Sequence, residues 1–318
     1  MANALKQEWS KPRTILFATE IPSNERAFSY ALAQAREFDA ALIPFHVYDS
    51  LVVAASETSG ARYHDYAVAA RSEMHHLEPM AERARAAGVR CEVVVRPGLP
   101  ADQILTYVRE SDIDRVVMGT HSPGPVGKLL VGSVAEAVVR TATVPVFVVG
   151  PHVPEHMPAG HTRTVLCACS LLDTTAVVAG FAAFVAAQHR ARLVLQHVIK
   201  PQERHEVLAG HTIDEIENQL INLVPYELHE KIEVQAVVVP GDPTEELLYQ
   251  SRSQQADLIV LGAQGASAFA AITRHGVVYK LLAQAHCPVL TLSPAVLSQA
   301  GATGEKVSQL ETFIAGTF

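Results

Sequence analysis

A glycine-rich segment in the first half of the chain has the composition of a phosphate-binding loop. An apolar run ending at Met118 leads into Gly119-Thr120-His121-Ser122-Pro123-Gly124-Pro125-Val126-Gly127, and Gly132-Ser133 follow directly before a helix-like stretch. Glycines let a backbone approach an anion closely, and a helix N-terminus offers unpaired N–H groups and the positive end of the helix dipole. Ser133 is placed either to cap that helix or to bind a phosphate oxygen. The segment therefore predicts a phosphate cradle, most naturally for a nucleotide, or a plain tight turn, because glycine-rich turns between strands and helices are common.

Other reactive side chains fit structural roles better. His152, His156 and His161 lie in a proline-rich segment at spacings of four and five, which gives them no common face for a metal ion. Cys167 and Cys169 share one face of an expected strand, as core thiols do, and the chain has no Cys-x-x-Cys. We expect neither a metal site nor a catalytic residue.

No motif of a dedicated hydrolase is present. The sequence has neither a Gly-x-Ser-x-Gly nucleophile elbow nor the Gly-x4-Gly-Lys-(Ser/Thr) loop of P-loop NTPases, and Lys128 beside Gly127 lacks the hydroxyl residue that should follow it. No pair of acidic residues stands beside the glycine-rich segment to hold Mg²⁺ and orient a water. Slow nucleotide hydrolysis or autophosphorylation stays open.

Composition narrows the class of protein. The 318 residues predict about two domains at roughly 150 residues each. Hydrophobic residues make up 49% of the chain, which excludes wholesale disorder, and the net charge of −8 without a basic cluster argues against nucleic-acid binding. No apolar run reaches the ~20 residues of a membrane span, and Met1–Arg13 lacks the apolar core of a secretory signal. We expect a cytoplasmic protein.

The chain repeats itself. Five glycine, proline and aspartate residues of the first half recur in one ungapped register, each 143 positions later: Gly98 and Gly241, Pro100 and Pro243, Asp114 and Asp257, Gly119 and Gly262, and Pro145 and Pro288. Three prolines between positions 151 and 158 indicate a linker, and the composition after position 293 turns to Ser, Gly, Ala and Thr. We therefore predict two copies of one fold, in residues 1–150 and 160–293, and a C-terminal tail at 294–318.

Each repeat alternates expected strands with expected helices. In the first repeat the strands fall near 14–19, 41–47, 91–95, 114–118 and 144–149, and the helices near 25–38, 63–87, 101–111 and 133–141. The strands are Val, Ile and Leu runs with little alternation, which is typical of parallel strands buried on both faces. The pattern predicts an α/β protein of two repeated doubly wound (Rossmann-like) five-stranded parallel-sheet domains, with ligand sites beyond the carboxyl ends of the strands.

The sequence resembles the universal stress protein family. ATP-binding members carry Gly-x2-Gly-x9-Gly-(Ser/Thr) after the fourth strand, and this chain matches from Gly119 through position 122 to Gly132-Ser133, except that position 122 is Ser122. A first strand ending in acidic Glu20, a second strand with His46-Val47 and the closing Val144-Pro145-Val146 are also similar to the family. The resemblance covers nearly the whole chain twice, as in the tandem members.

The resemblance implies an ATP site in the first repeat, with or without Mg²⁺, and a regulatory or sensor role in the stress response. Adenine would be held by the backbone of Val47, with contacts near Met118 and Gly119. Glu20 stands where the family has Asp. The implied binding residues are Thr19, Glu20, Val47, Met118, Gly119, Thr120, His121, Ser122, Gly132, Ser133 and Val134. The Cβ of Ser122 is expected to weaken binding if that position needs a positive φ.

The second repeat is a poorer match to the motif. The 143-residue offset places His275 opposite Gly132 and Gly276 opposite Ser133, and Ser170 replaces the acidic residue after the first strand. An imidazole at the first position would fill space that a phosphate needs. We therefore predict that only the first repeat binds nucleotide.

Two rival classes remain to be compared with this prediction. In the first, neither repeat binds nucleotide and the protein is a dimerisation or interaction module of the same fold. The second, an ATP-using ligase or nucleotidyl transferase, needs a glycine-rich loop after the first strand, which Thr19–Asn24 lacks. For assembly, the resemblance implies a homo-oligomer or an intramolecular pseudo-dimer in which the two closing strands pair, because exposed strand edges are a liability.

Overall fold

The computed structural model describes residues 9–48, 64–120, 131–155, 162–171, 174–208, 210–263 and 276–302. The chain divides into two compact units, which are treated separately below. The first unit is Lys11–Pro158, and the second consists of Met1–Ser10 together with Ala159–Phe318.

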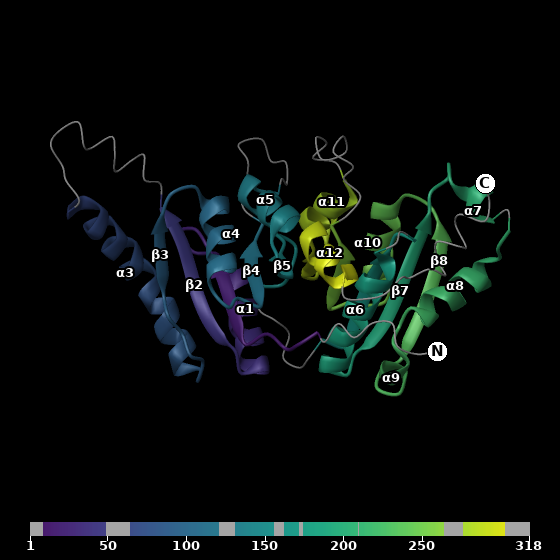
Figure 1. Ribbon diagram of the computed structural model, residues 1–318, viewed down its shortest axis with the longest axis horizontal. Helices are drawn as coiled ribbons and strands as arrows, with labels where there is room; N and C mark the ends of the chain where they lie inside the picture. Colours follow the sequence, from purple (N-terminus) through teal and green to yellow (C-terminus); the bar gives the residue numbers. More distant parts are fainter. Residues whose placement is uncertain are drawn as a thin grey trace. The chain divides into compact units, whose positions relative to one another are not determined.

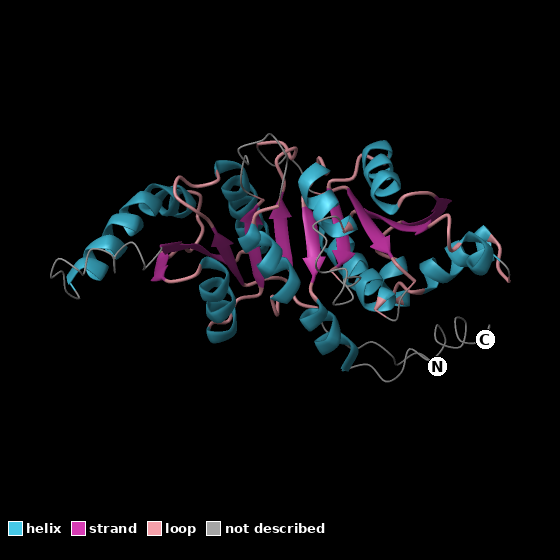
Figure 2. Ribbon diagram, turned by 90° about the horizontal axis from the view of Figure 1, so that it is seen from above, coloured by secondary structure: helices cyan, strands magenta, loops and turns pink. Residues whose placement is uncertain are grey.

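The first unit is a parallel sheet with helices on both faces (Figures 1 and 2). Its strand order is β3-β2-β1-β4-β5, and the pairs are parallel. Helices α1 and α3 lie on one face, where Arg83 of α3 bonds to Glu25 of α1, and α4 packs beside α5 on the other. The strands are β1 (Thr14–Ala18), β2 (Ala41–Tyr48), β3 (Val94–Pro97), β4 (Arg115–Gly119) and β5 (Val146–Val149), and the helices are α1 (Glu25–Phe38), α3 (His64–Ala86), α4 (Pro100–Glu110) and α5 (Ser133–Thr141).

The second unit has the same topology, with strand order β8-β7-β6-β9-β10 and parallel pairs. Its strands are β6 (Thr164–Cys169), β7 (Arg192–Ile199), β8 (Val234–Pro240), β9 (Leu258–Gly262) and β10 (Val289–Leu292). Its helices are α6 (Thr175–His189), α7 (Arg204–Leu208), α8 (Ile213–Asn222), α9 (Tyr226–His229), α10 (Pro243–Ser253), α11 (Val277–Gln284) and α12 (Pro294–Ala302). The predicted architecture of two doubly wound parallel sheets is confirmed. The third strand begins three residues later than predicted, after an isolated bridge at Cys91.

The repeated aspartates explain part of the shared fold. Asp114 accepts hydrogen bonds from the backbone nitrogens of Arg13 (2.8 Å) and Thr14 (2.9 Å) through one carboxylate oxygen. Asp257 binds the residues at the start of β6 in the same way, at 2.7 and 3.0 Å. In each unit the carboxylate therefore fixes the first strand to the start of the fourth.

Helix α12 lies in the segment whose composition predicts a tail. Its Val296, Leu297 and Ala300 are buried, and it packs against α6 and β10. Residues 303–318 lie outside the described residues. At the other end of the chain, Trp9 packs edge-on against Phe181 of α6, with ring centroids 4.6 Å apart. In the described part of the chain, no helix is both long and apolar enough to span a membrane.

Two glycines with different backbone conformations allow a test of how φ limits substitution by alanine. Gly180 lies inside α6 and Gly88 follows α3 at φ 82°, and apart from the adjacent backbone a Cβ built at either position meets no heavy atom of the described residues within 4 Å. We expect Gly180→Ala to stabilise the protein by ~0.5–1 kcal/mol, because alanine loses less backbone entropy in a helix. Gly88→Ala adds the same methyl group but should destabilise by ~1–2 kcal/mol, since L-residues disfavour positive φ. Urea unfolding followed by circular dichroism measures both, and equal effects would contradict this account.

Candidate functional site

The candidate site lies at the carboxyl edge of the first unit's sheet, where β1 ends before β2. Ala18 pairs in register with Phe45 of β2 on one side and with Met118 of β4 on the other. Leu42 exchanges backbone hydrogen bonds with residues 90 and 92 on the β3 side, whereas Phe45 accepts one from Thr19 on the β1 side. Because alternate residues face alternate neighbours, the backbone groups of Val47 face the β1 side, beyond the last residue of that strand.

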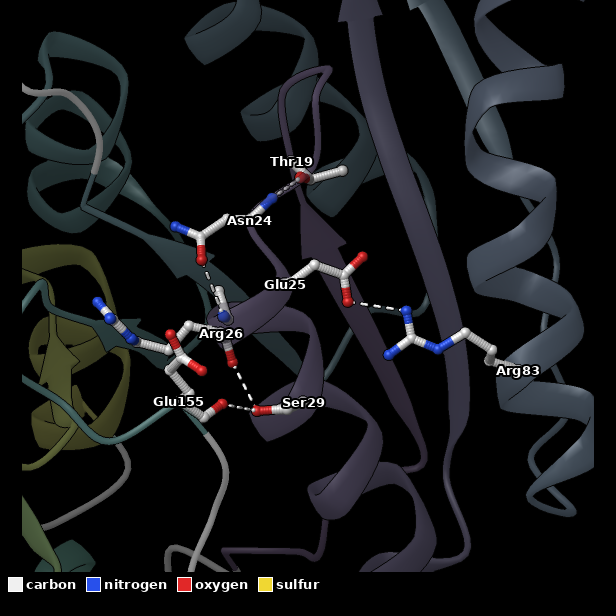
Figure 3. Close-up of polar contacts among 8 residues, drawn as sticks. Thr19, Asn24, Glu25, Arg26, Ser29, Arg83 and Glu155 are labelled. Carbon is white, nitrogen blue, oxygen red and sulfur yellow. Dashed lines mark hydrogen bonds and ion pairs between the residues drawn. The ribbon is translucent and has the colours of Figure 1, made fainter.

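The turn after β1 is fixed by hydrogen bonds to its own side chains (Figure 3). The Thr19 hydroxyl donates to the carbonyl oxygen of Glu20 (3.1 Å) and accepts from the backbone nitrogen of Asn24 (3.4 Å). The Asn24 side-chain oxygen accepts from the backbone nitrogen of Ala27 (3.0 Å) and so caps α1. Glu20 itself is exposed. Thr19 and Glu20 thus form a hydrogen-bonded polar turn at the end of β1, beside the second strand that carries Val47.

The end of β4 contributes a close approach and an unpaired hydroxyl. A Cβ on Gly119 would collide with the side-chain amide of Asn24, so only glycine lets the α1 cap lie against this strand. The next residue, Thr120, donates its backbone N–H to the carbonyl oxygen of Val149 (3.1 Å). Its hydroxyl oxygen is buried and has no hydrogen-bond partner among the residues that the structure describes. A buried hydroxyl without a partner is costly, and a bound ligand is one way to satisfy it.

The entrance of α5 offers free backbone donors. Gly132 is the N-cap residue, with φ −63° and ψ 149°, and no side chain caps the helix. Its carbonyl oxygen accepts from the backbone nitrogen of Glu136 (2.9 Å), which leaves the N–H groups of the first turn, Ser133 and Val134 included, without intrahelical partners. Of the two roles that the sequence leaves open for Ser133, capping is therefore not used, and its exposed hydroxyl is available to a ligand.

Nine of the eleven predicted binding residues lie at this edge of the sheet or at the start of α5, and His121 and Ser122 lie outside the described residues. The nine are Thr19, Glu20, Val47, Met118, Gly119, Thr120, Gly132, Ser133 and Val134. Two further residues contact the site and were not predicted as site residues. Asn24 packs on Gly119, and His46 bonds to Thr19. Asn before a helical run is a cap signal, which could have identified Asn24 as the cap of α1 but not its contact with Gly119.

The second unit shows that one predicted alignment was wrong. The offset of 143 places His275 opposite Gly132, but the N-cap residue of α11 is Gly276, with φ −65° and ψ 154°. Its carbonyl oxygen accepts from the backbone nitrogen of Lys280 (3.2 Å), as that of Gly132 does from Glu136. Because α11 is one residue shorter than α5 while both end in the same register, Gly276 matches Gly132 and Val277 matches Ser133. No imidazole therefore replaces the capping glycine.

Other differences still separate the two units. Val277 lacks the hydroxyl of Ser133, and Ser170 lacks the carboxylate of Glu20. Ala263 bonds its backbone N–H to Leu292 as Thr120 does to Val149, but it has no hydroxyl. A Cβ on Gly262 would meet Val178 of α6 at 3.1 Å and Leu297 of α12 at 3.3 Å, both apolar, where the first unit has Asn24. The second unit thus has fewer polar groups at the equivalent edge.

His197 in the second unit predicts an acid-sensitive stability. The side chain is 5% exposed, and burial lowers the pKa of its imidazole, with Lys200 adding to the effect and the bond to Cys169 and the charge of Glu203 opposing it. The unfolded chain binds a proton below pH ~6.5 that the folded chain resists, so the free energy of unfolding should fall as pH drops from there. His197→Asn keeps an amide donor but does not titrate, and its stability should fall less between pH 7.5 and 5.5. Urea unfolding at both values checks this, and equal losses in variant and parent would contradict it.

Among the described residues, no three His, Cys, Asp or Glu side chains come together in a group that could hold a metal ion. Burial raises the pKa of Cys91 to about 11 and that of Cys287 to about 12, which disfavours the reactive thiolate form of these two residues. The arrangement can bind a polar ligand through backbone and hydroxyl groups.

Comparisons with known proteins agree with the repeat. The universal stress protein family model matches residues 11–150 and again 161–293. A universal stress protein of Thermus aquaticus is 32% identical over 139 residues, covering 43% of this chain and 98% of that protein, and one of Mycolicibacterium smegmatis is 31% identical over 132 residues, covering 41% and 92%. The crystal structure of a universal stress protein from Archaeoglobus fulgidus has a TM-score of 0.68 at 19% identity, covering 89% of this chain and 97% of that one. The chain belongs to the universal stress protein family and carries two of its domains in tandem.

Proposed function

We propose that the first unit binds ATP and that the protein acts in the cytoplasm as a regulator or sensor in the stress response. The observation that carries the proposal is the buried Thr120 hydroxyl, which has no partner among the described residues and lies at an edge of the sheet near N–H groups without intrahelical partners. The second unit has Ala263 at the same place, so the unpaired hydroxyl is not a requirement of the fold.

The parts of an ATP molecule match the groups at this edge. The backbone of Val47, directed past the end of β1, can pair with the adenine edge, and the exposed Glu20 carboxylate can accept from ribose hydroxyls. The N–H groups at the start of α5 and the Ser133 hydroxyl suit the phosphates, because a helix N-terminus favours an anion. Mg²⁺ would be held chiefly by the phosphates, since no acidic group of the described chain is gathered for it.

Calorimetric titration of the full chain with ATP tests this proposal. We expect one ATP per chain, and Thr120→Val should weaken binding while keeping the volume of the side chain. A titration without heat, together with no nucleotide in the extract of freshly purified protein, would favour the interaction module instead. Two equivalent sites per chain would contradict the restriction to the first unit.

For assembly, we propose that the closing strands, residues 146–149 and 289–292, pair either within one chain or between chains. Light scattering after size-exclusion chromatography separates the two forms. A mass of 34.3 kDa indicates an intramolecular pseudo-dimer, and a multiple of it indicates a homo-oligomer.

A further inference from the structure

The two units hold the histidine of their second strand in the same way. The Nδ1 atom of His46 lies 3.0 Å from the carbonyl oxygen of Thr19, and Nδ1 of His197 lies 2.9 Å from the carbonyl oxygen of Cys169. A carbonyl oxygen only accepts hydrogen bonds, so Nδ1 carries the proton and donates in both cases. Each bond joins a backbone carbonyl at the end of the first strand to a histidine side chain of the second strand.

In the first unit this bond lies at the candidate nucleoside site. The carbonyl belongs to the peptide between Thr19 and Glu20, and His46 directly precedes Val47 in the chain. The His46 side chain is 11% exposed, and its Nε2 atom is 3.9 Å from a carboxylate oxygen of Glu73 on α3, which is too long for a hydrogen bond. The Nδ1 bond is thus the short contact that fixes the imidazole.

We propose that His46 is a positioning residue for the nucleoside half of the ATP site. Its Nδ1–H holds the Thr19–Glu20 peptide in place relative to the backbone of Val47, so that the carboxylate and the backbone groups reach the ribose and adenine together. This rests on the proposed function of the first unit. The phosphate end, at α5, is formed by other elements and does not depend on His46.

A set of variants separates this role from support of the fold. His46→Asn keeps an amide N–H near the position of Nδ1, whereas His46→Gln moves it toward the position of Nε2 and His46→Ala removes it. We expect His46→Gln and His46→Ala to weaken adenosine and ATP by the same factor, about tenfold for one lost hydrogen bond. His46→Asn should stay within about twofold of the parent, as should Glu73→Gln, because Glu73 lies beyond bonding distance.

The second unit supplies the matched control. His197→Gln breaks the equivalent bond beside Ser170 and should change the thermal midpoint without changing the affinity for adenosine or ATP. If the parent binds ATP, three results would overturn this inference alone. The first is a His46→Ala variant that binds adenosine as tightly as the parent, and the second is a His46→Asn variant that loses as much affinity as His46→Ala. The third is a His197→Gln variant whose affinity for adenosine falls as much as that of His46→Gln. If the parent binds neither ligand, the proposed function fails and this inference falls with it. Measuring adenosine and ATP by calorimetry, beside melting curves, distinguishes all these results.

Discussion

Replacing Ser133 by valine should weaken ATP binding by roughly ten- to a hundredfold while leaving the affinity for adenosine unchanged. The change gives the first unit the residue that the second unit has at the equivalent position, Val277. It removes a hydroxyl that is placed to donate to a phosphate oxygen, and a hydrogen bond to a charged group contributes ~1.5–3 kcal/mol. The melting temperature should hardly move, because Ser133 is exposed and does not cap α5.

The reverse change is the control. Val277→Ser restores the hydroxyl at α11 but leaves Ala263, Ser170 and the apolar cover of Gly262 by Leu297 in place. We therefore expect calorimetry to give one ATP per chain for both the parent and Val277→Ser. A second site in Val277→Ser would mean that one hydroxyl decides between the units. An unchanged ATP affinity in Ser133→Val would remove Ser133 from the phosphate site.

The sequence alone predicts the framework of the site because the framework depends on strands and turns. Gly119 and Gly262, at the ends of the fourth strands, and Pro145 and Pro288, before the closing strands, keep one register because the sheet fixes their spacing. The start of the helix between the glycine and the proline is less constrained. The helix runs from cap Gly132 to cap Ala142 in one unit and from Gly276 to Ala285 in the other, so α11 is one residue shorter than α5 and the segment before it is one residue longer. An ungapped alignment keeps the total length and therefore cannot show that the helix of the second unit begins one residue later.

The side-chain contacts of the site could not be predicted from the sequence, for a different reason. Nothing in the local sequence shows that Asn24 lies on Gly119 or that His46 bonds to Thr19, since both contacts join elements that only the sheet brings together. Helix α12 was missed because its small residues, Ser, Gly and Ala, resemble a tail in composition. What keeps it helical is tertiary packing, since α12 lies against α6 and β10 and its Leu297 is buried.

Leu297→Ala should destabilise the second unit by ~2–5 kcal/mol, the usual cost of removing a buried leucine side chain. Helix α6 is apolar on nearly every side and is buried along most of its length, so a sheet on one face cannot cover it alone. Helix α12 packs on α6, and its Leu297, 1% exposed, lies against Gly262 of β9. Ser298→Ala, on the exposed side of α12, is the matched control and should stay within ~0.5 kcal/mol of the parent.

Trp9 makes this loss measurable in the second unit. It is the single tryptophan of the chain and packs on Phe181 of α6, so its fluorescence follows the unfolding of the unit that α12 covers. The urea midpoint by fluorescence should fall in Leu297→Ala, whereas ATP affinity should not, because the proposed nucleotide site belongs to the first unit. A midpoint equal to that of Ser298→Ala would show that α12 is not packed on α6 in solution. A parallel loss of ATP binding would show that the second unit supports the site of the first, and the restriction of nucleotide binding to one independent unit would then be wrong.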